Sequence, residues 1–298
     1  MDANLAVIQT DNLQPIKDLV LNGLDSPESK RAYGRALDSF FSWYSAQNKP
    51  GLSKALVNEY KTALQERGLS AATINLQLSA IRKLAIEAKD NGLIDPVLAA
   101  GIQETKGVKS HGVKIGNWLN KQQAQDLIHA PDLTTIIGIR DHAIIAVMIG
   151  TGLRRSELVS LTFEHIQQRE NRWIIADITG KGNRVRTVPM PTWAKSAIDQ
   201  WATAAGISSG LVFRSIHRGG KVNGSLTNQA IRNIILNYGG PAPHDLRRTF
   251  SKLAHKGGAA IEQISLTLGH ASIKTTEIYL GIEQDLTSAP CDFITLTI

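Results

Sequence analysis

Six residues of this chain are suited by type and spacing to chemistry on a phosphodiester. They are Arg154, Lys181, His244, Arg247, His270 and Tyr279. Fixed cations can hold a phosphate and stabilise the charge that develops on it, while a phenol can act as the attacking group. The six residues therefore form a candidate catalytic set.

The two arginines are the strongest candidates for holding a phosphate. A planar guanidinium forms paired hydrogen bonds to two phosphate oxygens, whereas lysine offers a point charge. A second interpretation stays open for each of them. Arg154 can pair with Glu157 on a helix face, and Arg247 can be an ordinary surface arginine, since such residues are common on protein surfaces.

The histidines and the lysine are weaker candidates when each is taken alone. His244 precedes Arg247 by three residues, so a helix would place both on one side. Gly269 is suited to end a helix and to present His270 from the following turn. Lys181 lies between two glycines, where a tight turn can approach a ligand and the amine can protonate a leaving alkoxide. Structural histidines and a generic hairpin lysine are the alternatives.

Tyr279 is the candidate nucleophile. An unperturbed phenol has a pKa of about 10, so it needs neighbouring positive charge or a base to attack at neutral pH. The alternative is an aromatic side chain that packs on a helix with Ile278 and Leu280. No Gly-Lys-Ser or Gly-Lys-Thr sequence occurs, so dependence on ATP or GTP is not expected.

Four motifs join these residues into one pattern. They are Thr-Gly-Leu-Arg-Xaa-Ser-Glu-Leu, Gly-Lys-Gly-Asn followed by Val-Pro, Pro-His-Xaa-Leu-Arg-Arg-Thr-Phe, and Leu-Gly-His-Xaa-Ser-Ile-Xaa-Thr-Thr-Xaa-Xaa-Tyr. In order and approximate spacing they resemble the tyrosine recombinase (phage integrase) family, and the resemblance covers nearly the whole chain.

The resemblance implies a mechanism and a set of partners. Tyr279 would attack a phosphate of double-stranded DNA to give a 3′-phosphotyrosine, Lys181 would protonate the leaving 5′-oxygen, and His244 would assist proton transfer. The implied ligands of the non-bridging oxygens are Arg154, Arg247 and His270. No cofactor and no metal are implied, and strand exchange would need a homotetramer on paired recombination sites. Integration, excision or resolution of a mobile or replicating element would be the outcome.

Composition and charge agree with a nucleic-acid partner. Residues 106–256 hold 21 basic and 9 acidic side chains, a net charge of +12. Such a block suits a polyanion, although a solvated surface without function is the alternative. No secretion signal or membrane span is apparent, and Cys291 is the single cysteine. A cytoplasmic, metal-free protein that does not bind membranes is expected.

The expected fold is mainly α with a small antiparallel β-sheet. Residues 1–100 predict a domain of four helices, 101–117 a basic linker, and 118–298 a mixed α+β domain with a C-terminal tail. The resemblance implies that the first is a helical core-binding (SAM-like) DNA-binding domain and that the second is the catalytic domain. Periodicity is already lost from Pro96. The helices expected in the catalytic domain are 136–150, 192–205, 227–238, 244–256, 261–268 and 272–279. Segments 173–178 and 185–188 predict a hairpin around Lys181.

Groove contacts and the tail complete the predictions. The DNA-binding candidates are Arg82 and Lys83 on an N-terminal helix and Asn228, Gln229 and Arg232 on the helix after Thr227. Residues 287–298 alternate like a strand, unlike the terminal helix of many family members. Two other functions stay open: a type IB topoisomerase-like enzyme, and a non-catalytic DNA-binding protein.

Overall fold

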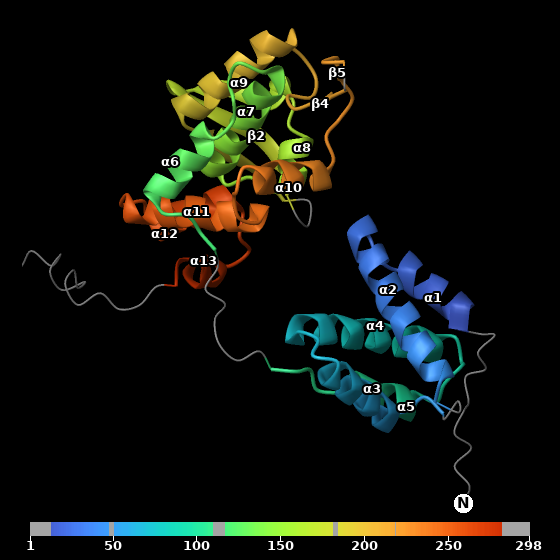
Figure 1. Ribbon diagram of the computed structural model, residues 1–298. Coiled ribbons are helices and arrows are strands. Elements are labelled where there is room, and N and C mark those ends of the chain that lie inside the picture. Colours follow the sequence, from blue (N-terminus) through green and yellow to red (C-terminus); the bar gives the residue numbers. More distant parts are fainter. Residues whose placement is uncertain (1–12, 48–50, 110–116, 181–183, 218, 282–298) are drawn as a thin grey trace, which may run out of the picture. The chain divides into compact units, whose positions relative to one another are not determined.

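The protein forms two compact units that each have a hydrophobic core. The computed structural model describes residues 13–47, 51–109, 117–180, 184–217 and 219–281. Contacts between Cα atoms divide the chain into Met1–Val113 and Lys114–Ile298 (Figure 1). One buried cluster runs from Ile16 to Ile102 and the other from Ala124 to Leu246. Each unit is described by itself below.

The described part of the first unit is all helical. Its helices are α1 (Leu13–Asn22), α2 (Pro27–Ser45), α3 (Lys54–Glu66), α4 (Ala71–Asp90) and α5 (Pro96–Gln103). Serines begin three of these helices, because the side chains of Ser26, Ser53 and Ser70 accept hydrogen bonds from backbone N–H groups of the first turn. Phe40 and Tyr60 meet edge to face in the core, with ring centroids 5.1 Å apart.

Helix α5 corrects the sequence interpretation, which treated the chain from Pro96 as irregular. Asp95 accepts hydrogen bonds from the N–H groups of Val97 and Leu98, and Pro96 occupies the first turn. Ala99 and Ile102 are fully buried. The pattern was missed because a helix of eight residues shows barely two turns of periodicity. The first unit therefore has five helices in its described part, and the exact limits of the linker stay a prediction.

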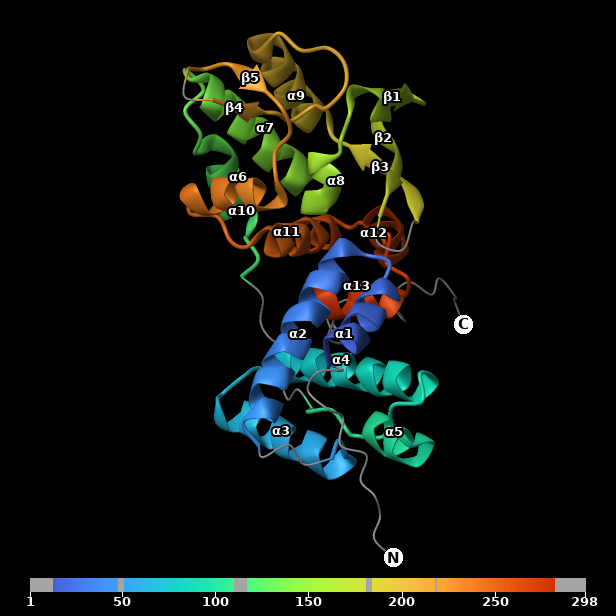
Figure 2. The ribbon, with the colours of Figure 1, turned by 90° about the vertical axis from the view of Figure 1, so that its right-hand side faces the viewer.

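The second unit is built around helix α7 (Ile136–Thr151), which is apolar on nearly all sides. It packs against α6 (Lys121–His129), α9 (Thr192–Ala205) and α11 (Pro243–Lys256) (Figure 2). Eleven of its sixteen residues are buried, as the near-continuous apolar sequence predicts. Gly152 ends α7 with a φ of 63°, a left-handed conformation that glycine adopts without strain.

A three-stranded antiparallel sheet lies beside these helices. Strand β2 (Arg172–Thr179) pairs with both β1 (Ile166–Arg169) and β3 (Val185–Met190). The predicted hairpin of β2 and β3 is confirmed. Strand β1 was not predicted, because Gln167, Gln168 and Arg169 lack an apolar row. Its turn at Glu170 and Asn171 has two positive φ values, 49° and 59°, as type I′ hairpins require.

Short elements complete the second unit. They are α8 (Arg155–Val159), a 3₁₀ turn (Phe163–His165), β4 (Ser215–Ile216), β5 (Val222–Asn223), α10 (Asn228–Asn237), α12 (Ile261–Leu268) and α13 (Ile273–Leu280). Every predicted helix of this unit is present within one or two residues of its expected ends. The fold class, mainly α with small antiparallel sheets, is confirmed. The tail, with its predicted strand-like segment and Cys291, lies outside the described residues.

Candidate active site

Arg154 lies between the end of α7 and the beginning of α8. It is the residue before the first turn of α8, and its backbone N–H donates to Oε2 of Glu157 at 2.7 Å. Its Nη1 donates to Oε1 of the same carboxylate at 2.8 Å, so the pairing with Glu157 that the sequence left open does occur. The Arg154 side chain is nevertheless 29% exposed, while that of Glu157 is 1% exposed. Arg154 is thus anchored at one edge and accessible at another.

Arg247 is a buried residue of α11, so the interpretation as a surface arginine is wrong. Only 2% of it is exposed. Its Nη1 donates to the carbonyl of Gly152 at 2.7 Å, and its Nη2 donates to the carbonyl of Leu268. These two carbonyls follow α7 and end α12. One guanidinium therefore joins the segment that leads to Arg154 with the segment that leads to His270.

His270 and His244 have depressed pKa values. Loss of solvent lowers the pKa of His270 to about 4, and the positive charges of Arg247, Arg154 and Arg186 act in the same direction. The pKa of His244 is lowered by loss of solvent and then by Arg248 and Arg247, although much of its surface is exposed. At neutral pH both imidazoles are therefore uncharged and able to donate one hydrogen bond each.

Helix α13 carries Tyr279 and is held by side-chain contacts at two points. Nδ1 of His270 lies 2.8 Å from Oγ1 of Thr276, a fully buried residue three positions before Tyr279. At the C-terminal end of α13, Nζ of Lys252 on α11 donates to the carbonyl of Leu280 at 2.6 Å. The same Nζ lies 4.8 Å from the centre of the Trp118 ring. The sequence did not single out Lys252 or Trp118, whose partners are distant along the chain.

Lys181 lies outside the described residues, but the described residues on either side of this segment are hydrogen-bonded to each other. The N–H of Gly180 donates to the carbonyl of Arg184 at 2.8 Å. A Cβ placed on Gly180 would come within 3.2 Å of Nη1 of Arg154 and 3.0 Å of Nη1 of Arg186. Gly180, the residue before Lys181, thus lies close to the guanidinium groups of Arg154 and Arg186.

A cavity of about 170 Å³ opens at these residues. Its lining includes Arg154 and His270 together with Arg184 and Arg186, two arginines that sequence reasoning missed. A signal for Arg186 was present, since Arg186, Val188 and Met190 alternate along β3 and the latter two are buried. An arginine on the inward row of a strand needs a buried partner. The cavity therefore combines three guanidinium groups with one neutral imidazole, which suits a phosphate.

The DNA-binding candidates fall in different environments. Gln229 and Arg232 are exposed on α10, and the carbonyl of Asn228 accepts from Nη1 of Arg155 on α8. Helix α10 therefore begins beside the helix that follows Arg154. In the first unit, Arg82 donates from Nη2 to the carbonyl of Thr105, and Lys83 pairs with Glu87 at 2.8 Å. Both side chains have partners within the first unit, which the sequence did not predict.

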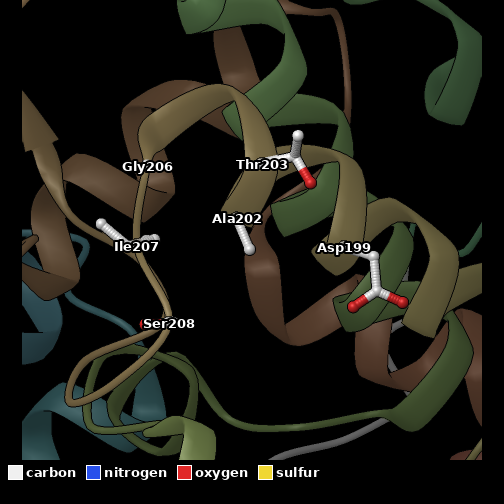
Figure 3. Close-up of a pocket in the computed structure, with 6 residues that line it drawn as sticks. All are labelled: Asp199, Ala202, Thr203, Gly206, Ile207 and Ser208. Carbon is white, nitrogen blue, oxygen red and sulfur yellow. The ribbon is translucent and has the colours of Figure 1, made fainter.

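Two other hollows among the described residues of the second unit lack basic side chains. A shallow hollow at the end of α9 is lined by Asp199, Ala202, Thr203 and residues 206–208, without a basic side chain (Figure 3). No group of three or more histidine, cysteine, aspartate or glutamate residues in the described chain is arranged to hold a metal ion. None of the helices within the described residues is both long and apolar enough to cross a membrane.

Comparison with known proteins places the chain in a family. Residues 117–285 match the phage integrase family model, and residues 16–92 match the phage integrase N-terminal SAM-like domain. The chain belongs to the phage integrase family. The resemblance seen in the sequence is therefore confirmed, and so is the expected class of enzyme, a tyrosine recombinase.

Relatives and solved structures agree with this family. The chain is 27% identical over 258 residues to tyrosine recombinase XerC of Xylella fastidiosa strain M23, covering 85% of each protein. It is 31% identical over 186 residues to tyrosine recombinase XerD of Pasteurella multocida, covering 58% of this chain and 60% of the other. A structure of XerH recombinase bound to a palindromic difH substrate has a TM-score of 0.70 and 19% identity, covering 92% of this chain and 82% of that one. A lambda integrase dimer on a COC′ core site has a TM-score of 0.69 and 14% identity, covering 93% and 98%.

Proposed function

We propose that this protein is a site-specific recombinase that cleaves and rejoins double-stranded DNA through a 3′-phosphotyrosine. The observation that carries the proposal is the cavity lined by Arg154 and His270, behind which Arg247 joins the two segments that lead to them. The cavity lining and Arg247 together bring in residues of all four motifs, and His270 contacts Thr276 of the helix that carries Tyr279. A phosphate placed there meets the charge distribution that stabilises a pentacovalent phosphorane.

Each residue has a role in this proposal. Arg154, Arg247 and His270 hold the non-bridging oxygens, and the neutral state of His270 makes it a hydrogen-bond donor rather than a third charge. Tyr279 attacks, its O–H bond breaks as the O–P bond forms, and the 5′-oxygen leaves. Lys181 gives that oxygen its proton, and His244 assists proton transfer. The phosphotyrosine conserves the energy of the original bond, so no cofactor is needed for rejoining.

The partners follow from the reaction. Strand exchange requires two duplexes, and we propose that four copies of the chain assemble on paired sites in the cytoplasm. Asn228, Gln229 and Arg232 are proposed groove contacts, since amide and guanidinium groups read base edges. Arg82 and Lys83 are proposed contacts of the first unit. Integration, excision or resolution of a mobile or replicating element is the proposed biological outcome.

A covalent-adduct assay tests the chemistry. Duplexes bound by the protein are selected from a random-sequence library and prepared with a nick that traps the cleaved strand. We expect a DNA–protein adduct that resists denaturant, and we expect Tyr279→Phe to abolish the adduct but not binding, because only the nucleophilic oxygen is lost. Tyr238→Phe is the control, since the Tyr238 hydroxyl donates instead to Asp141 at 3.2 Å.

The outcomes separate the three candidate functions. Recombination of two paired sites supports the proposal. Relaxation of supercoiled DNA of any sequence by a single copy indicates a topoisomerase-like enzyme. Binding without an adduct from the unaltered protein indicates a non-catalytic DNA-binding protein.

A further inference from the structure

Arg186 of β3 makes an unusually complete set of bonds. Its Nη1 and Nη2 donate to the two oxygens of Glu157 at 2.8 and 2.9 Å, a fork-to-fork pair. Its Nε donates to the carbonyl of Thr267 in α12 at 2.8 Å. Only 9% of the Arg186 side chain is exposed. This guanidinium therefore ties together β3, α8 and α12.

The surrounding backbone is built closely around this side chain. A Cβ on Gly269 would lie 2.8 Å from Cδ of Arg186, nearer than real Cβ contacts come. A Cβ on Gly180 would lie 3.0 Å from Nη1. Gly269 directly precedes His270, and Gly180 directly precedes Lys181. Both segments that present these proposed catalytic residues are thus held at contact distance from Arg186.

Besides linking these elements, Arg186 balances the charge of Glu157. Burial alone would raise the pKa of Glu157, but hydrogen bonds from Arg186 and from the backbone of Arg154 lower it to about 2. The carboxylate is therefore ionised, and its Oε1 accepts from Nη1 of both Arg154 and Arg186 at 2.8 Å. Two cations and one anion leave a net positive charge beside the cavity. Without Arg186, the buried carboxylate would cancel the charge of Arg154.

We propose that Arg186 is a positioning residue for DNA cleavage. Arg186 holds the Glu157 carboxylate, so that this carboxylate neither neutralises the Arg154 guanidinium nor turns it away from the scissile phosphate. The inference rests on the proposed function and assigns Arg186 an action through Arg154 and Glu157 rather than a bond to the reacting atoms.

The test is a rescue experiment with the full-length protein. Arg186→Met should slow adduct formation by about 100-fold, the scale seen when one preorganised charge is lost. The double variant with Glu157→Gln should form the adduct at least about 10-fold faster than Arg186→Met, because a neutral amide no longer competes with the phosphate for Arg154. The glutamine oxygen can still accept from the backbone N–H of Arg154. A role in packing alone predicts the opposite, since the second substitution would then lower the rate further.

Arg184→Met is the matched control. It removes one positive charge from the same cavity while keeping the pair of Arg186 and Glu157. Glu157→Gln should therefore give no rescue in the Arg184→Met background. Thermal unfolding checks every variant, and where Arg186→Met is unfolded, Arg186→Gln goes through the same comparison. Absence of rescue in a folded variant overturns the proposal.

A spectroscopic readout keeps the inference separate from the proposed function. In Arg186→Met, Arg154 should be the only arginine bound to the Glu157 carboxylate and should bind it more tightly. Rotation of the Arg154 guanidinium about its Nε–Cζ bond, measured by nitrogen-15 NMR, should therefore slow. The double variant should reverse this change. If the unaltered protein forms no adduct, the proposed function fails, yet slowed and then restored rotation still supports the action of Arg186 on Arg154 through Glu157. Unchanged rotation overturns it.

Discussion

At the scale of single residues, the charge of the site depends on the hydrogen-bond partners of each guanidinium. Arg154 shares a carboxylate with Arg186, whereas Arg247 donates to two backbone carbonyls. The two carbonyls fix the orientation of the Arg247 guanidinium without bringing a negative charge to it. The net charge at Arg154 depends instead on the partners of Glu157.

Removal of Arg247 should affect both stability and cleavage. Arg247→Ala leaves the carbonyls of Gly152 and Leu268 buried without their donor, at a cost of about 1–3 kcal/mol each. Cleavage should fall by several orders of magnitude, because the phosphate also loses a fixed charge, as expected for such a donor. Chemical denaturation and adduct formation measure the two effects. Arg169→Ala, on the exposed end of β1, should change stability by less than about 0.5 kcal/mol. A fully stable and active Arg247→Ala protein would exclude the assignment.

The depressed pKa of His270 predicts a pH dependence of stability. An unfolded chain protonates this histidine below its ordinary pKa of 6.5, whereas the folded protein does so only near 4. Between these values the unfolded state binds more protons, so stability should fall as the pH is lowered from 7 to 4.5. Denaturation of the unaltered protein and of His270→Gln at both pH values measures this contribution. His244 acts in the same direction, so the variant should retain part of the dependence. An identical dependence in both proteins would contradict the assigned shift.

Much of the site was predictable at this scale, because each motif joins a candidate catalytic residue to a local structural signal. The sequence predicts a helix over 136–150 shortly before Arg154, His244 and Arg247 on one helix, and His270 after a glycine, and the structure agrees. The partners of these residues were harder to foresee. Glu157 was considered only as a partner of Arg154, and its stronger pairing with Arg186 spans 29 positions. Such long-range pairs depend on the packing of β3 against α8 and α12.

At the scale of elements, helix ends do most of the positioning. Arg154 precedes α8, Gly152 follows α7, and His270 follows the glycine that ends α12. Elements with strong periodicity and capping signals were predicted with accurate limits. Short elements such as α5, α8 and β1 were missed, since five to eight residues show little periodicity and polar strands show none.

Two glycines at helix ends offer a matched test of this positioning. Gly269 ends α12 with a φ of 63°, and Gly206 ends α9 with a φ of 64°. Alanine at either position should cost about 1–2 kcal/mol for the left-handed conformation. Only Gly269→Ala also drives a methyl group into Arg186, because nothing lies within 4 Å of the Cβ position at Gly206. We expect similar losses of backbone stability and a cleavage defect confined to Gly269→Ala. Equal cleavage by the two variants would show that the close contact between Gly269 and Arg186 is not needed for cleavage.

At the scale of the whole molecule, the two units differ in charge as well as in fold. Residues 1–113 hold 13 basic and 12 acidic side chains, whereas residues 114–298 hold 20 and 14. Each unit also has its own buried cluster. Independent cores allow each unit to fold alone, and the uneven charge assigns most of the electrostatic attraction for DNA to the second unit.

Separate expression of the two units tests both consequences. Fragments 1–113 and 114–298 should each unfold cooperatively, because neither cluster contains residues of the other unit. The logarithm of DNA affinity falls with the logarithm of salt concentration in proportion to the phosphates neutralised. Fragment 114–298 should therefore retain most of the salt dependence of the full chain on a selected duplex, and fragment 1–113 should show little. Calorimetry and fluorescence anisotropy over a range of salt concentrations measure the two properties. A steep salt dependence in fragment 1–113 would instead assign the main phosphate contacts to the helical unit, and loss of cooperative unfolding would show that the two cores depend on each other.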